Sequence, residues 1–133
     1  MINSIQIGKV IYNKLSENEI IHNVVADRIY PVIAEQTTNY PFIIYYRNSI
    51  VNTIFNKDGS VEDDVSFTVT VVSTKYNESA DLANEIREIF EKKQIPNNLM
   101  RITNSRLIAI DESYEDNAYV QRLTFSCTVN NIN

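Results

Sequence analysis

The sequence is poor in the residues that carry most enzyme and cofactor chemistry. It has one cysteine, Cys127, one histidine, His22, and glycines only at positions 8 and 59. One cysteine excludes an internal disulfide and is consistent with a reducing compartment. Two isolated glycines leave no glycine-rich phosphate-binding loop. Because acid–base and nucleophilic chemistry need paired groups, we expect no enzyme activity, no cofactor and no metal site.

Long apolar runs and basic clusters are also missing. No run approaches the roughly 20 residues of a membrane helix, and the first residues lack the basic flank and apolar block of a secretory signal. We therefore expect a protein that stays in the cytoplasm where it is made, without a membrane partner. The net charge of −5, with no Lys/Arg cluster, argues against tight or specific nucleic-acid binding. An acidic protein can still line a path along which DNA passes.

The clearest regular elements are a strand and the helix that follows it. Apolar residues alternate with Ser and Thr from Val65 to Val71, which predicts a strand over 65–73. Apolar residues then recur at helical spacing, which predicts a helix over 79–93 that packs across the sheet. Asn77 or Ser79 would cap its start, and Lys92 and Lys93 would suit the negative end of its dipole.

The remaining elements follow from the same kinds of signal. They are an amphipathic helix at 4–15, a short second helix introduced by a capping box at Ser16–Glu19, an edge strand or extended segment at 29–33, a strand at 42–47, a hairpin formed by 99–114 and 118–129, and a frayed tail at 130–133. The main order is helix, strand, strand, strand, helix, strand, strand. This predicts one α+β domain, residues 1–133, with a mostly antiparallel sheet and helices on one face.

Residues 51–64 are predicted to form an arm or long hairpin. Beside it lie apolar residues that the pattern places outside regular elements, namely Ile50, Val51, Ile54 and Phe55. A monomer would gain little by exposing them, so we expect them to make a subunit contact.

Two acidic groups are predicted at loop tips. One comprises Glu62, Asp63 and Asp64, and the other comprises Asp111, Glu112, Glu115 and Asp116. Neither has the fixed alternation and central glycine of a calcium loop. We interpret both as solvated tips that would face a lumen or a docking partner.

The single histidine and cysteine fit structural roles. His22 lies in the short second helix without a nearby partner base or nucleophile, which favours a surface histidine. Cys127 alternates in phase with Leu123, Phe125 and Val129, which favours a core thiol.

Several segments taken together resemble a known family. They are the helical start closed by Leu15-Ser16, the run Asp27-Arg28-Ile29-Tyr30-Pro31, the run Tyr40-Pro41-Phe42-Ile43-Ile44-Tyr45, and the strand–helix unit Val65 to Phe90 with Tyr76 before the helix. In this combined order the chain resembles the tail-completion proteins of long-tailed bacteriophages, which include tail terminators and tail-to-head joining proteins. The chain departs from typical members in its richness in Asn and Ile and its paucity of glycine.

The resemblance implies a structural virion protein at the head-proximal end of the tail. Such a subunit assembles as a ring, typically a hexamer, that stops growth of the tail tube and presents a docking surface to the head connector. Its implied partners are further copies of itself, the tail tube protein and the connector or neck protein, with DNA only passing through. Two alternatives stay open: a head-completion or neck protein of the same junction, and a small non-catalytic bacterial ligand-binding domain.

Overall fold

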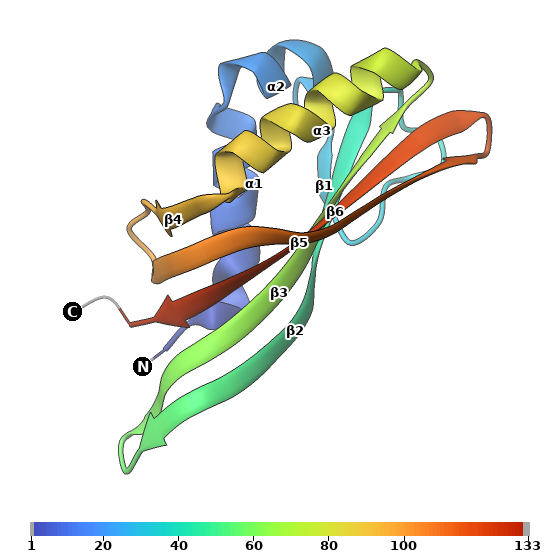
Figure 1. Ribbon diagram of the computed structural model, residues 1–133. Coiled ribbons are helices and arrows are strands. Elements are labelled where there is room, and N and C mark those ends of the chain that lie inside the picture. The colour runs from blue at the N-terminus through green and yellow to red at the C-terminus, as the bar shows by residue number, and fades with distance from the viewer. Residues whose placement is uncertain (1, 132–133) are drawn as a thin grey trace.

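The protein folds as a six-stranded sheet with its helices on one face (Figure 1). The computed structural model describes residues 2–131. A short 3-10 turn, Ser4–Gln6, leads into α1 (Ile7–Glu17) and α2 (Glu19–Val25), and α3 (Tyr76–Phe90) follows the third strand. The strands are β1 (Ile29–Pro31), β2 (Phe42–Asn56), β3 (Gly59–Ser73), β4 (Lys92–Ile95), β5 (Arg101–Glu115) and β6 (Ala118–Asn130). The expected α+β class is confirmed.

The sheet is built from two long hairpins placed side by side. The strand order is β1-β2-β3-β6-β5-β4, and β3 and β6 form the centre. All neighbouring strands are antiparallel except β1, which runs parallel to β2. Strand β1 lies at the edge of the sheet, as Pro31 predicts. The β2–β3 and β5–β6 turns therefore lie at opposite ends of the sheet (Figure 1).

An aromatic cluster joins α3 to the centre of the sheet. Phe67 of β3 and Phe125 of β6 stack with centroids 5.3 Å apart, and Phe90 of α3 lies 5.4 and 5.6 Å from them. All three rings are fully buried. Helix α1 adds its apolar side, including Ile11 and Leu15, to the same core. The predicted strand at 65–73 and its covering helix are thus both present, packed as the two apolar patterns require.

The predicted helix boundaries need three corrections. Helix α3 begins at Tyr76 and has Lys75 at its N-cap position without a side-chain cap, so neither Asn77 nor Ser79 caps it. Ser79 is buried, and its hydroxyl donates to the carbonyl of Tyr76. Ser16 does not cap α2, because Asn18 does so by accepting a bond from the backbone N–H of Ile21.

The far end of α3 also differs from prediction. The helix ends at Phe90, and Lys92 and Lys93 belong to the short strand β4, which pairs with β5. This strand was not predicted, because its own sequence pattern does not indicate a strand. It is stabilised by pairing with β5. Of the predicted tail at 130–133, Asn130 ends β6, and residues 132–133 lie outside the described residues.

Candidate assembly surface

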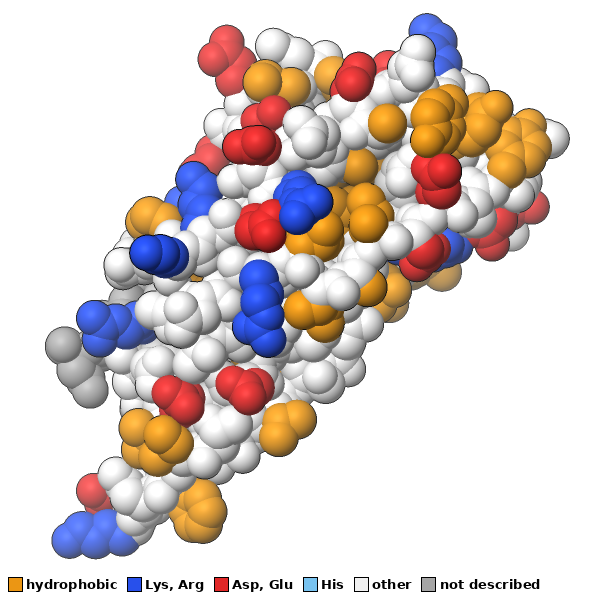
Figure 2. Space-filling view, viewed as in Figure 1, with side chains coloured by type: hydrophobic (Ala, Val, Ile, Leu, Met, Phe, Trp, Pro, Cys, Tyr) orange, Lys and Arg blue, Asp and Glu red, His pale blue; other side chains and the backbone are white. Residues whose placement is uncertain are grey.

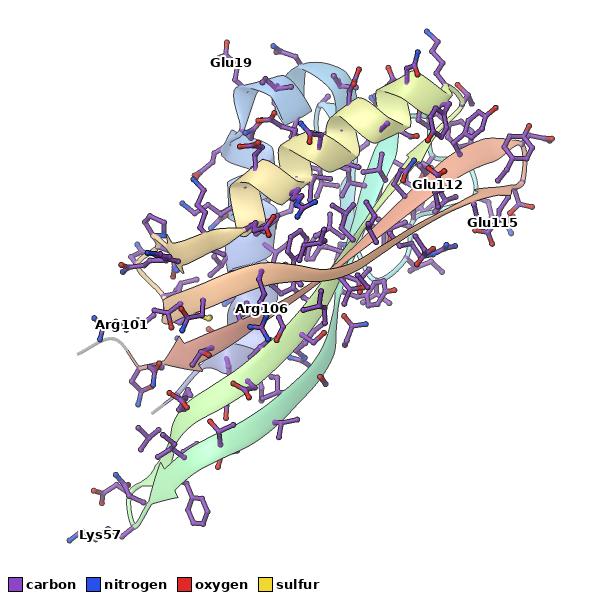
Figure 3. The ribbon with its side chains drawn as sticks, in the orientation of Figure 1. Glu19, Lys57, Arg101, Arg106, Glu112 and Glu115 are labelled. Atoms are coloured by element: carbon purple, nitrogen blue, oxygen red, sulfur yellow. The ribbon has the colours of Figure 1, made fainter. Side chains whose placement is uncertain are left out.

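The β2–β3 hairpin extends well past the helices and is the most prominent projection of the molecule (Figure 1). Lys57 marks its tip in Figure 3. Residues 51–64, predicted as an arm or long hairpin, form its distal half. At the turn, the backbone N–H of Asp58 donates to the side chain of Asn56, and Gly59 adopts a φ of 117° that other residues rarely tolerate.

The apolar residues of the hairpin are exposed, but they are part of a strand. Val51, Ile54 and Phe55 are 59%, 50% and 75% exposed, whereas Ile50 is half-buried against the core. The prediction that these four residues lie outside regular elements is therefore wrong. Bulges after Arg47 and after Asn52 interrupt the alternation of β2 and hide the strand period from a pattern search.

The first predicted acidic tip is also wrong in its placement. Glu62, Asp63 and Asp64 lie within β3, away from the turn. Asp63 is buried and accepts hydrogen bonds from the hydroxyl of Ser4 and, at 2.9 Å, from the side chain of Asn52. Its carboxylate ties the hairpin to the start of the chain. Glu62 accepts a bond of 2.9 Å from Thr53 across the hairpin, so it too has a bracing role.

The second acidic group lies at the opposite end of the sheet from the hairpin tip. Figure 3 labels Glu112 and Glu115 at one end and Lys57 at the other. Asp111 and Glu112 are exposed in β5, Glu115 ends that strand, and Asp116 starts the turn. Within one subunit the two acidic groups are therefore not brought together.

Arg122 partly neutralises this second group. Its guanidinium donates to Asp111 at 2.9 Å and also bonds Glu115. Bonds from Ser113 and Arg122 lower the pKa of Glu115, and the same carboxylate raises the pKa of Arg122. Glu112 accepts bonds from Tyr76 at 2.9 Å and Gln121 at 3.0 Å, and the first of these raises the pKa of the Tyr76 phenol.

A tyrosine cluster beside this acidic group was not predicted. Tyr119 lies 4.9 Å from Tyr114 and 5.5 Å from Tyr76, measured between ring centroids. Tyr76 and Tyr114 are 45% and 60% exposed. The space-filling view shows apolar side chains gathered near this end of the molecule and, separately, near the tip of the β2–β3 hairpin (Figure 2). Tyr114 and Tyr119 pair across β5 and β6, and in the sequence both lie within two residues of the predicted turn, which is the signal that could have revealed the pair.

Cys127 and His22 lie in different environments of the fold. Cys127 is buried in the core, and desolvation raises its pKa to about 12, so its thiol stays protonated at neutral pH. His22 is exposed on α2, as predicted. Within residues 2–131, no three His, Cys, Asp or Glu side chains gather as metal ligands would, and no helix is both long and apolar enough to cross a membrane. An open hollow of about 740 Å³ beside the hairpin turn is lined by polar residues including Asp58, Arg101 and Asn130.

Comparison with known proteins identifies the fold. No protein-family model and no curated protein matches the sequence. Among solved structures, a chain from the virion of a native gene transfer agent particle matches with a TM-score of 0.73, covering 90% of this chain and 91% of that one at 10% identity. A second solved chain matches with a TM-score of 0.66, covering 98% of both at 12% identity. The protein thus shares its fold, over nine-tenths of its length, with a chain of a virion.

Proposed function

We propose that this protein is a structural subunit of a phage-like particle. The fold shared with a gene transfer agent virion chain over nine-tenths of both sequences is the observation that carries the proposal. The exposed apolar side chains on a projecting hairpin add to it, because isolated subunits of assemblies keep such surfaces for their neighbours.

Within the particle, the proposed position is the head–tail junction. The subunit forms a homo-oligomeric ring, of six copies by family resemblance, at the head-proximal end of the tail tube. There it stops tube growth and presents a docking surface to the head connector, while DNA passes through without specific binding. The acidic residues at the β5–β6 end would repel DNA phosphates weakly if they face the lumen.

The first test is the mass of the purified protein in solution. Light scattering across a range of concentrations, with negative-stain images of the same sample, should show rings of about six subunits. A monomer or dimer that also fails to bind tail tubes would contradict the proposal and favour a ligand-binding domain. Binding to purified connectors in preference to tail tubes would instead assign the protein to the neck.

A further inference from the structure

Two long strand edges of this sheet have no pairing partner among the described residues. Strand β1 covers β2 only as far as Tyr45, so residues 46–56, here called the β2 edge, pair with β3 alone. Strand β4 covers β5 only as far as Ser105, so residues 106–115, here called the β5 edge, pair with β6 alone. Nearly all residues of both edges are exposed. Such edges present unpaired backbone N–H and C=O groups and are templates for pairing with another chain.

The two edges lie on opposite sides of the sheet and at opposite ends (Figure 1). β2 runs from the β1 end toward the hairpin turn, and β5 runs in the opposite direction. When a second copy is placed beside the first in the same orientation, its β2 edge therefore meets the first copy's β5 edge in antiparallel fashion. Neither the neighbour's β1 nor the first copy's β4 occupies the paired stretch, because they cover the other halves of these strands.

We propose that neighbouring subunits join head to tail by pairing the β2 edge of one copy with the β5 edge of the next, so that the sheets become continuous around the ring. This inference rests on the proposed function and names the surface through which the ring forms. The occupant of each edge is a second copy of this chain. The interface is heterologous, because two different surfaces of the same subunit meet.

The charges of the two edges are complementary. The β2 edge, residues 46–56, contains one cation, Arg47, and no acid, which gives +1. The β5 edge, residues 106–115, contains one cation, Arg106, and three acids, Asp111, Glu112 and Glu115, which gives −2. Antiparallel pairing brings Arg47 toward the acidic end of β5. Attraction between the edges favours this pairing over contact between two identical β5 edges.

Bulges limit which residues pair. They interrupt β2 after Arg47 and after Asn52, and β5 before Ala109, so the regular stretches are residues 49–52 and 109–115. Val51 and Ala109 point away from the helices, since they pair with Asp64 and Thr124, whereas Ile50 and Ile110 share the helix side. Placing Val51 opposite Ala109 also places Ile50 opposite Ile110. Both cross-strand pairs are then apolar and on matching faces.

This register has a geometric consequence that suits a ring. Within one subunit Val51 is level with Thr128 of β6, and Ala109 is level with Thr124. The neighbour is therefore shifted by four residues, or about 13 Å, along the strands. Four strands per subunit at the usual spacing span about 19 Å, so the shift corresponds to a strand tilt of about 35°. Closed barrels tilt their strands by about 35–45°. The offset is thus compatible with closure.

The test is a cross-link between singly substituted subunits. In a Cys127→Ala background, Val51→Cys and Ala109→Cys are prepared separately, mixed, and treated with a bismaleimide that spans about 8 Å. The mixture should give a covalent dimer on a denaturing gel, and neither variant alone should. In the matched control, Lys93→Cys is used in place of Ala109→Cys. Lys93 lies in β4, which covers β5 only up to Ser105, outside the stretch that the neighbour's β2 edge pairs with. Val51→Cys and Lys93→Cys should therefore stay unlinked.

Each outcome separates this inference from the proposed function. Rings in solution with a Val51–Ala109 cross-link support both. Rings without that cross-link overturn the edge pairing and leave the ring proposal intact. A dimer formed by Val51→Cys alone overturns head-to-tail pairing in favour of two-fold contact between β2 edges. Monomers at every concentration, with no cross-link in the presence or absence of tail tubes, count against both.

Discussion

Asn52 donates a hydrogen bond of 2.9 Å to the buried carboxylate of Asp63, across the two strands of the projecting hairpin. The other carboxylate oxygen accepts from Ser4, which is 59 residues away in sequence. A buried carboxylate is costly unless its lone pairs are satisfied. The bond from Ser4 to Asp63 therefore ties the hairpin to the start of the chain, and the bond from Asn52 joins the two strands of the hairpin.

Replacing Asn52 with Ala should lower the free energy of unfolding by about 1–3 kcal/mol, because the buried acid loses a donor. Urea denaturation would measure the change. Ser49→Ala, an exposed substitution on the same strand, should stay within about 0.5 kcal/mol of the natural protein. Equal stability of the two variants would show that Asp63 does not depend on Asn52.

The double change Ile54→Ser and Phe55→Ser should reduce assembly without unfolding the subunit. Both side chains are at least half exposed, so the isolated subunit loses little burial. Light scattering should show smaller species at unchanged melting temperature. Ile33→Ser removes an equally exposed apolar side chain from a loop and should leave assembly unchanged. If oligomer size stays the same in the double variant, the distal part of the hairpin around Ile54 and Phe55 is not part of the interface.

Cys127 should make stability depend on pH in the alkaline range. Burial raises the pKa of the Cys127 thiol from 9.0 to about 12. Below pH 9 the thiol is neutral in both the folded and the unfolded state, so its full contribution to the free energy of unfolding is present. Above that value the unfolded thiol ionises while the folded one stays neutral, and about 1.4 kcal/mol per pH unit is lost until about pH 12. The check is the difference in unfolding free energy between the natural protein and Cys127→Ala, measured at several pH values. A difference that does not change with pH would contradict this account.

The double variant His22→Ala and Cys127→Ala should still form rings. His22 is exposed on α2, and the Cys127 thiol is buried in the core. We expect neither side chain to carry out chemistry. Some loss of stability is expected from the shortened core side chain. Ring formation is scored only on samples whose circular dichroism shows folding. A folded double variant that loses a specific activity would argue for a catalytic role.

Much of the fold could be predicted because its signals are local. The alternation from Val65 to Val71 and the helical stripe of α3 were sufficient for the central strand, its helix and the α+β class. Hairpin β5–β6 was predictable from its polar turn, where Asp116 and Asn117 both take positive φ values. The core role of Cys127 followed from its phase with Leu123 and Phe125.

The candidate surface was harder to predict because its signals are not local. The acidic run at 62–64 predicted a loop, yet Asp63 is buried in a strand. Its carboxylate accepts hydrogen bonds from Ser4, which is distant in sequence, and from Asn52, which lies next to a bulge. The tyrosine cluster forms only when the start of α3 approaches the β5–β6 turn. Lys92 and Lys93 lie in a strand and not in the predicted helix, because that segment pairs with β5.

The sequence alone determined which segments form strands and helices and which of their sides are apolar, since period and composition act over a few residues. It also limited histidine and cysteine chemistry to two positions, His22 and Cys127. Only the tertiary structure decided the strand order, the burial of Asp63 and the two uncovered edges at opposite corners of the sheet. These depend on pairing between residues far apart in the chain, where backbone hydrogen bonds and core packing choose among partners that local patterns cannot distinguish.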